Sequence, residues 1–214
     1  MQRPNIFLDY GGLIFENRFN HDTLFRAHGQ VRNYLKLSDG RQISEKDLSQ
    51  AHDSVIREYL EDRKATLKEW SMERIMKEVL ERLRVHPNHI PSICAIYSLE
   101  DHDYWPKQGT AEALPRLADA NDLHIVSNTP HASLIHELRS HGMLDYFKTI
   151  TMSWEVGFRK PHPAIYQEAL KRANATAKES IFVSHDEVEV EGARAIGMKG
   201  LLAQTLEEVR RSLK

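Results

Sequence analysis

The sequence predicts an α/β protein with a parallel β-sheet, helices on both faces of that sheet, and an inserted all-helical domain. Three observations support this prediction. A short apolar strand near the N-terminus ends at a carboxylate, Asp9. A long stretch over residues 17–104 then shows only helical periodicity. From Trp105 onward strand-like and helix-like segments alternate, which is typical of βαβ units in a parallel sheet.

The first strand is predicted over residues 5–8, Asn5-Ile6-Phe7-Leu8, a short apolar run consistent with a buried parallel strand. It ends at Asp9, and Gly11-Gly12 then give the backbone the freedom that a tight turn needs. The apolar pattern resumes briefly over residues 13–15. The chain therefore begins with a strand and a turn that meet at a carboxylate.

The stretch over residues 17–104 is predicted to form a bundle of helices. Apolar side chains recur at helical spacing over residues 48–60 and again over residues 75–83, so each segment has one face that can pack into a core. Ser38-Asp39-Gly40 interrupts the pattern, and Ser44 followed by Asp47 predicts the start of the next helix. We interpret these apolar stripes as packing faces.

The later elements follow in a regular order. Helices are expected over residues 110–120, 132–141, 164–173 and 190–196, and strands over residues 123–126, 149–152, 181–183 and 200–203. This order predicts a Rossmann-like core formed by residues 1–16 and 105–214. Residues 17–104 would form a helical cap inserted into that core.

Composition excludes several classes of protein. The chain has 214 residues, of which 41% are hydrophobic and 28% charged, and its net charge of −2 argues against binding to nucleic acid or a membrane surface. It has no run of about 18 apolar residues, and the run before Asp9 is too short for a signal peptide. The single cysteine, Cys94, excludes an intrachain disulfide. We expect a cytoplasmic protein.

Polar side chains follow several predicted strands at the points where the strands end. Asp9 follows the first strand, Ser127-Asn128 the second and Ser184-His185-Asp186 a later one, while Lys160 lies in a loop. In open parallel sheets, ligands bind at the carboxyl ends of the strands. A carboxylate, a hydroxyl, a lysine and acidic groups at that edge can transfer a phosphoryl or acyl group through an aspartyl intermediate.

The order of these residues resembles that of the haloacid dehalogenase superfamily over nearly the whole chain. Four segments carry the resemblance: residues 6–14 around Asp9, residues 124–129 around Ser127, residues 157–166 around Lys160, and residues 182–198. The inserted helices are similar to the C1-type cap of that family. The third and fourth segments are the most specific.

The resemblance implies a Mg²⁺-dependent hydrolase of a small phosphorylated metabolite. It makes Asp9 the nucleophile, Ser127 with Asn128 the contact to the phosphoryl group, and Lys160 the positive charge that pairs with both. The metal would be held by Asp9, by the carbonyl of Gly11, and by the carboxylates of Asp186 and Glu189.

Two positions depart from the family pattern. Gly11 stands where family phosphatases have the acid/base Asp, and His185 stands, without gaps, at the position of a metal-binding Asp. A register shift of one residue would bring in Asp186 instead. Two alternatives therefore stay open: a degenerate member that binds a ligand or partner without turnover, and a 2-haloacid dehalogenase that needs no metal.

Overall fold

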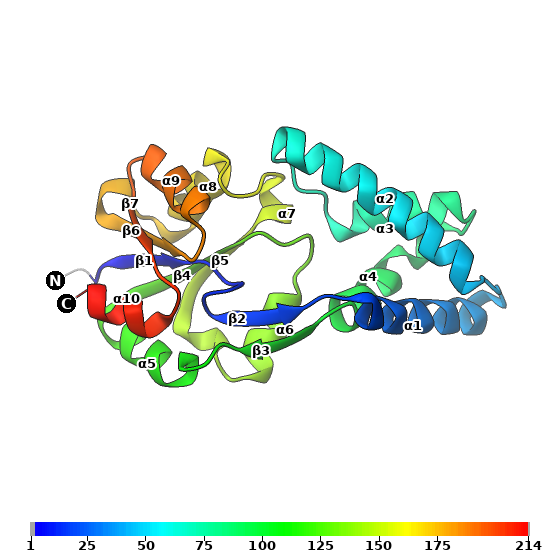
Figure 1. Ribbon diagram of the computed structural model, residues 1–214, viewed down its shortest axis with the longest axis horizontal. Helices are drawn as coiled ribbons and strands as arrows, with labels where there is room; N and C mark the ends of the chain where they lie inside the picture. Colours follow the sequence, from blue (N-terminus) through cyan, green and yellow to red (C-terminus); the bar gives the residue numbers. More distant parts are fainter. Residues whose placement is uncertain (1–2, 214) are drawn as a thin grey trace. The chain divides into compact units, whose positions relative to one another are not determined.

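A computed structural model describes residues 3–213 of the chain, which divides into two compact units (Figure 1). One unit is formed by residues 1–17 together with 104–214, and the other by residues 18–103. Two short strands, β2 (Phe15–Arg18) and β3 (Asp103–Pro106), pair with each other where the chain passes between the units. The prediction of helices alone over residues 17–104 is therefore wrong at its two ends. β2 is largely polar, and neither strand carries a regular apolar alternation.

The larger unit contains a five-stranded parallel sheet, which confirms the predicted fold class. Its strand order is β5-β4-β1-β6-β7. The strands are β1 (Asn5–Leu8), β4 (Asp122–Ser127), β5 (Phe147–Met152), β6 (Ser180–Ser184) and β7 (Lys199–Leu202). The first strand of the chain is central and completely buried, so Asp9 emerges from the middle of the sheet.

Helices cover both faces of this sheet (Figure 1). They are α5 (Thr110–Ala120), α6 (Ser133–Ser140), α7 (Ser153–Val156), α8 (Pro163–Ala173), α9 (Glu187–Ala195) and α10 (Leu206–Ser212). Helices α5, α6 and α10 pack in one apolar cluster with Ile6, Leu8 and Ile125. Helices α8 and α9 pack on the other face with Phe7 and Phe182. Successive residues of β1 thus point to opposite faces, as the pleat requires.

The smaller unit is formed by four helices around its own core. They are α1 (His21–Asp39), α2 (Glu45–Thr66), α3 (Met72–Arg82) and α4 (Ile90–Glu100). Gly40 ends α1 in the left-handed conformation, and the Ser44 hydroxyl accepts a hydrogen bond from the Asp47 amide at the start of α2, as predicted. Within residues 3–213, no helix combines the length and apolar character needed to cross a membrane.

Three polar side chains are buried together in the core of the helical unit. The rings of His28, His52 and Tyr97 lie 5.2–6.1 Å apart, and those of His52 and Tyr97 are stacked. His28 Nε2, His52 Nδ1 and the Tyr97 hydroxyl are buried without a hydrogen-bond partner in the described structure. Burial and the neighbouring His28 lower the pKa of His52 to about 4.

This lowered pKa predicts that His52→Phe makes stability less dependent on pH. Unfolding lets the ring take up a proton below its ordinary pKa of 6.5, whereas the folded protein resists protonation down to about pH 4. Wild-type stability should therefore fall as pH decreases through this window, by up to about 3 kcal/mol from His52. The measurement is urea unfolding at pH 7 and pH 5. His21→Phe, at a histidine whose side chain is 90% exposed, is the control and should keep the wild-type slope.

Candidate active site

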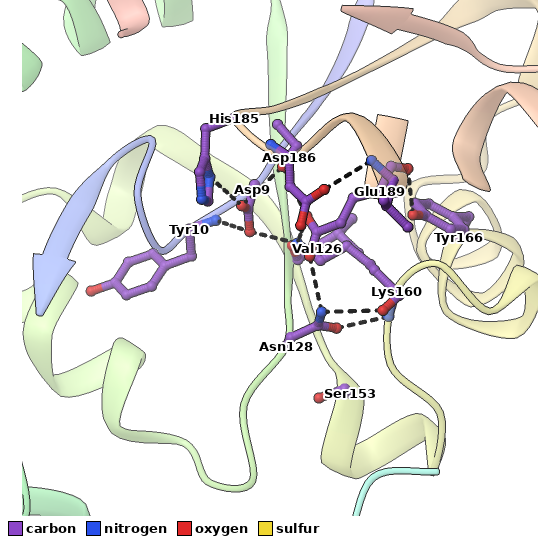
Figure 2. A network of polar contacts seen from close by, with 12 residues as sticks. Asp9, Tyr10, Val126, Asn128, Ser153, Lys160, Tyr166, His185, Asp186 and Glu189 are labelled. Carbon is purple, nitrogen blue, oxygen red and sulfur yellow. Dashed lines mark hydrogen bonds and ion pairs between the residues drawn. The ribbon is translucent and has the colours of Figure 1, made fainter. Parts of the chain in front are cut away.

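Most of the predicted site residues of the larger unit meet at the carboxyl ends of the central strands (Figure 2). Asp9 directly follows β1, Ser127 ends β4 and Ser184 ends β6. Lys160 comes from the loop before α8 and reaches the Asp9 carboxylate with its Nζ 2.5 Å from Oδ1. Because β1 pairs with both β4 and β6, the sheet itself brings these segments together.

Four polar groups surround the carboxylate of Asp9. Oδ1 accepts from Lys160 Nζ and, at 2.8 Å, from the Tyr10 amide. Oδ2 lies 3.1 Å from the Ser184 hydroxyl and 3.2 Å from Nδ1 of His185. Both oxygens of this nearly buried side chain are thereby fixed in position.

Lys160 is completely buried and has one acceptor for each of its three N–H groups. Nζ donates to Asp9 Oδ1, to Glu189 Oε2 at 2.9 Å and to the Val126 carbonyl at 2.9 Å. Its side chain is 0% exposed, so the charge is compensated entirely by protein groups. The lysine holds Asp9 and the first turn of α9 together.

Ser127, the last residue of β4, and Asn128, which follows it, differ in what they contact. Asn128 Oδ1 accepts from the Lys160 amide at 2.8 Å, and its Nδ2 donates to Glu189 Oε1 at 3.0 Å. Asn128 therefore positions the lysine loop and Glu189 with both ends of its amide. Ser127 is buried, and no described residue hydrogen-bonds to its hydroxyl. Of the two, Ser127 has the hydroxyl that is available to a ligand.

The loop after β6 places His185, rather than Asp186, at the Asp9 carboxylate. Asp186 is exposed and forms the N-cap of α9, where Oδ1 accepts from the Val188 amide at 2.8 Å. Within residues 3–213, no hydrogen bond joins Asp186 to Asp9. The register shift that would have brought Asp186 to Asp9 does not occur, because Asp186 is used as the helix cap.

The buried charges shift one another's pKa values. Burial by itself would raise the pKa of Asp9, but Lys160 and His185 together hold it below its ordinary value. Burial would lower the pKa of Lys160, but Asp9 and Glu189 raise it above its ordinary value. The hydrogen bond to Asp9 raises the pKa of His185. Asp9 is therefore an ionised carboxylate at neutral pH.

These residues do not fit the Mg²⁺ site that the sequence predicts. Mg²⁺ requires octahedral coordination, almost always by oxygen. Of the predicted ligands, Asp186 is directed to the cap of α9, and Glu189 is bound by Lys160, Ser184 and Asn128. The group that faces Asp9 from this loop is an imidazole. Asp9 and the Gly11 carbonyl are then the predicted ligands that remain, and both carboxylate oxygens of Asp9 already lie within hydrogen-bond distance of protein donors.

Tyr10, the aromatic residue after Asp9, is turned away from the site (Figure 2). Its ring stacks on Phe15 with centroids 5.1 Å apart, and its hydroxyl donates to Glu137 at 2.7 Å. The side chain is buried in the core of the larger unit. It therefore provides no aromatic wall beside the Asp9 carboxylate.

The sequence did not assign Ser184 and His185 to the site, although both contact Asp9. The Ser184 hydroxyl lies 3.1 Å from Asp9 and 2.8 Å from Glu189, and has one proton to share between the two carboxylates. The available signal was position, because both residues lie at the end of the strand that the sequence predicts over residues 181–183. Residue type concealed the signal, since neither is acidic.

The absence of a side chain at Gly12 leaves room for the His185 ring. We therefore expect Gly12→Ala and Gly11→Ala to differ strongly in stability and in the position of that ring. A Cβ at Gly12 would lie 2.5 Å from His185 Cε1, and the backbone there has φ +75°. Gly12→Ala should lose about 1–2 kcal/mol of stability from the left-handed backbone alone, and should displace the ring. A Cβ at Gly11 meets nothing within 4 Å, so Gly11→Ala is the matched control.

Urea unfolding and the NMR signal of the His185 ring carbon would measure both effects. Gly11→Ala should leave the ring signal near its wild-type position. An unchanged ring signal in Gly12→Ala would show that the His185 ring does not pack against this turn.

Comparison with known proteins shows similarity to one family. The sequence model described as haloacid dehalogenase-like hydrolase matches residues 37–203, most of the chain but not Asp9. A stretch of 80 residues is 38% identical to the sesquiterpene phosphatase astK of Aspergillus oryzae (strain ATCC 42149 / RIB 40). That stretch covers 37% of this chain and 40% of the phosphatase, so the chain spans less than half of that relative.

Solved structures show the same fold over nearly the full length. A 2-haloacid dehalogenase from Pseudomonas syringae pv. Tomato DC3000 has a TM-score of 0.67 and 17% identity, covering 100% of this chain and 98% of its own. A HAD phosphatase from Thermococcus onnurineus has a TM-score of 0.63 and 20% identity, with the same coverage. At these identities the similarity establishes the fold.

Proposed function

Because this chain belongs to the haloacid dehalogenase-like hydrolases, we propose that it hydrolyses a small phosphate monoester with Asp9 as the nucleophile. One observation carries the proposal. Asp9 is an ionised, nearly buried carboxylate at the end of the central strand, held in place by Lys160. A fixed carboxylate with a compensating positive charge can attack an electrophilic centre and form a covalent intermediate.

Two further observations favour a phosphate ester over other classes of substrate. The 80-residue stretch that resembles a sesquiterpene phosphatase supports a phosphorylated substrate. The Ser127 hydroxyl, without a partner among described residues, lies at the end of the neighbouring strand and can donate to a phosphoryl oxygen. In this proposal Asn128 and Glu189 do not contact the substrate, and their role is to position Lys160.

The proposed reaction has two steps. An oxygen of Asp9 attacks phosphorus, the bond from phosphorus to the ester oxygen breaks, and that oxygen leaves with the electron pair. Water then attacks phosphorus of the aspartyl phosphate, releasing inorganic phosphate and the carboxylate, and the water proton passes to solvent. Gly11 has no proton to give to the leaving oxygen, so substrates with acidic leaving groups should react fastest.

The test is hydrolysis of p-nitrophenyl phosphate by the purified protein, with halide release from 2-chloropropionate measured in parallel. Nitrophenolate leaves without protonation, so this substrate makes the least demand on the missing acid. Phosphate release without halide release supports the proposal. Halide release alone would identify a dehalogenase, and absence of both activities would favour a protein that binds its ligand without turnover.

A further inference from the structure

The surroundings of Asp9 leave little room for a cation. A carboxylate has about four acceptor sites, and three N–H groups and one hydroxyl surround the two oxygens of Asp9. Three of these donors are held by other parts of the fold: Lys160 by its three acceptors, Ser184 by its place in β6, and the Tyr10 amide by the backbone. His185 is the donor whose side chain is partly exposed, at 41%.

The His185 ring is also fixed by its neighbours. It lies against the Gly12 turn so closely that a Cβ at that position would meet three of its atoms within 2.8 Å. Its Nδ1 lies 3.2 Å from Asp9 Oδ2. The turn formed by Gly11 and Gly12 thus leaves room for an imidazole ring directly beside the proposed nucleophile.

We propose that His185 takes the place of a divalent cation at Asp9, so that the site works without a bound metal ion. This inference rests on the proposed phosphatase function and names the group that neutralises and orients the nucleophile together with Lys160. The imidazole N–H provides one hydrogen bond to Asp9 Oδ2, and the exposed edge of the ring stays open toward solvent, from which a phosphoryl group arrives. His185 is then a residue of the site in its own right.

The first measurement is activity on p-nitrophenyl phosphate in excess EDTA and in 5 mM Mg²⁺. We expect the wild-type rates to agree within about twofold. His185→Asp replaces the imidazole with an oxygen ligand, so its rate in EDTA should fall at least tenfold and should rise again with Mg²⁺. Glu187→Gln, an exposed position two residues further along on α9, is the control and should behave as wild type.

A second measurement does not depend on activity. Mn²⁺ titration followed by electron paramagnetic resonance counts bound metal in the wild type, in His185→Asp and in Asp9→Asn. The wild type and Asp9→Asn should bind the same number of Mn²⁺ ions. His185→Asp should bind one ion more than the wild type. If His185→Asp does not fold, His185→Asn tests the same point, because it should lose activity without gaining a response to metal.

The outcomes separate the two proposals. Wild-type activity that is lost in EDTA and restored by Mg²⁺ overturns the role of His185 and leaves the phosphatase function standing. Wild-type Mn²⁺ binding that Asp9→Asn abolishes overturns it as well, whether or not the protein is active. Activity absent under every condition refutes the phosphatase function, and the Mn²⁺ titration then still decides whether His185 excludes the metal.

Discussion

Asp9→Asn should reduce hydrolysis of p-nitrophenyl phosphate by roughly 10⁴-fold or more, because removing a covalent nucleophile eliminates the reaction path itself. The amide keeps the size of the side chain and can still accept from Lys160 Nζ and the Tyr10 amide. The fold should therefore survive, and circular dichroism should report wild-type secondary structure. The loss would then be chemical.

The matched control is Asp122→Asn, at the opposite end of the same sheet. Asp122 begins β4, whereas Asp9 follows the carboxyl end of β1. It should retain wild-type activity, which would show that the loss in Asp9→Asn is specific to Asp9 and not a result of how the variants were prepared. Retention of more than about 1% of the rate in Asp9→Asn would be incompatible with a nucleophilic role.

Lys160→Met should destabilise the protein by about 3–5 kcal/mol, the usual cost of leaving buried charge without its partner. The lysine Nζ lies within hydrogen-bond distance of Asp9 and Glu189, and without it the two carboxylates face each other around the single proton of Ser184. Activity should also fall, on the order of 10³-fold, because the nucleophile loses its orientation and its compensating charge. Urea unfolding at pH 7 measures the first effect.

The pH dependence identifies the cause of this destabilisation. Without Lys160, the buried carboxylates should have pKa values above those of the unfolded chain, so the variant is relatively more stable at low pH and loses stability as pH rises. The wild type behaves oppositely, because the lowered pKa of Asp9 contributes stability above the unfolded value of 3.8 that is lost as pH falls.

Two further variants complete the design. Adding Glu189→Gln to Lys160→Met removes one of the two opposed charges and should recover part of the lost stability. Lys148→Met, at an exposed position on β5, should leave stability unchanged within about 0.5 kcal/mol. Equal stability of Lys160→Met and the wild type would show that the buried charges do not depend on the lysine.

The fold was predictable from the sequence for the strands that are apolar and buried on both faces of the sheet. Residues 6–8 and residues 181–183 are continuous apolar runs, and they lie in the central strands β1 and β6. The pairing of β2 with β3 was not predictable, because Glu16, Arg18 and Asp103 place no apolar alternation in these strands. β2 and β3 form only when the fold of the chain brings their two segments side by side.

The site was predictable in its positions but not in its contacts. Asp9 and Lys160 followed from their places at strand ends and in the family pattern, and the structure joins them. Asn128 positions the loop that carries Lys160, and Asp186 caps α9. Both roles depend on side-chain orientation, which spacing along the sequence does not determine. Spacing along the sequence also does not show that the His185 ring packs against the turn at Gly12.

The central position of β1 has a consequence for folding during synthesis. This strand is made well before its two partners, because β4 begins at Asp122 and β6 at Ser180. At about 5–20 residues per second, it waits on the order of ten seconds for a neighbour. The helical unit of residues 18–103, with its own core, is made during that interval. The ion pair between Asp9 and Lys160, 151 residues apart, can therefore form only late in folding.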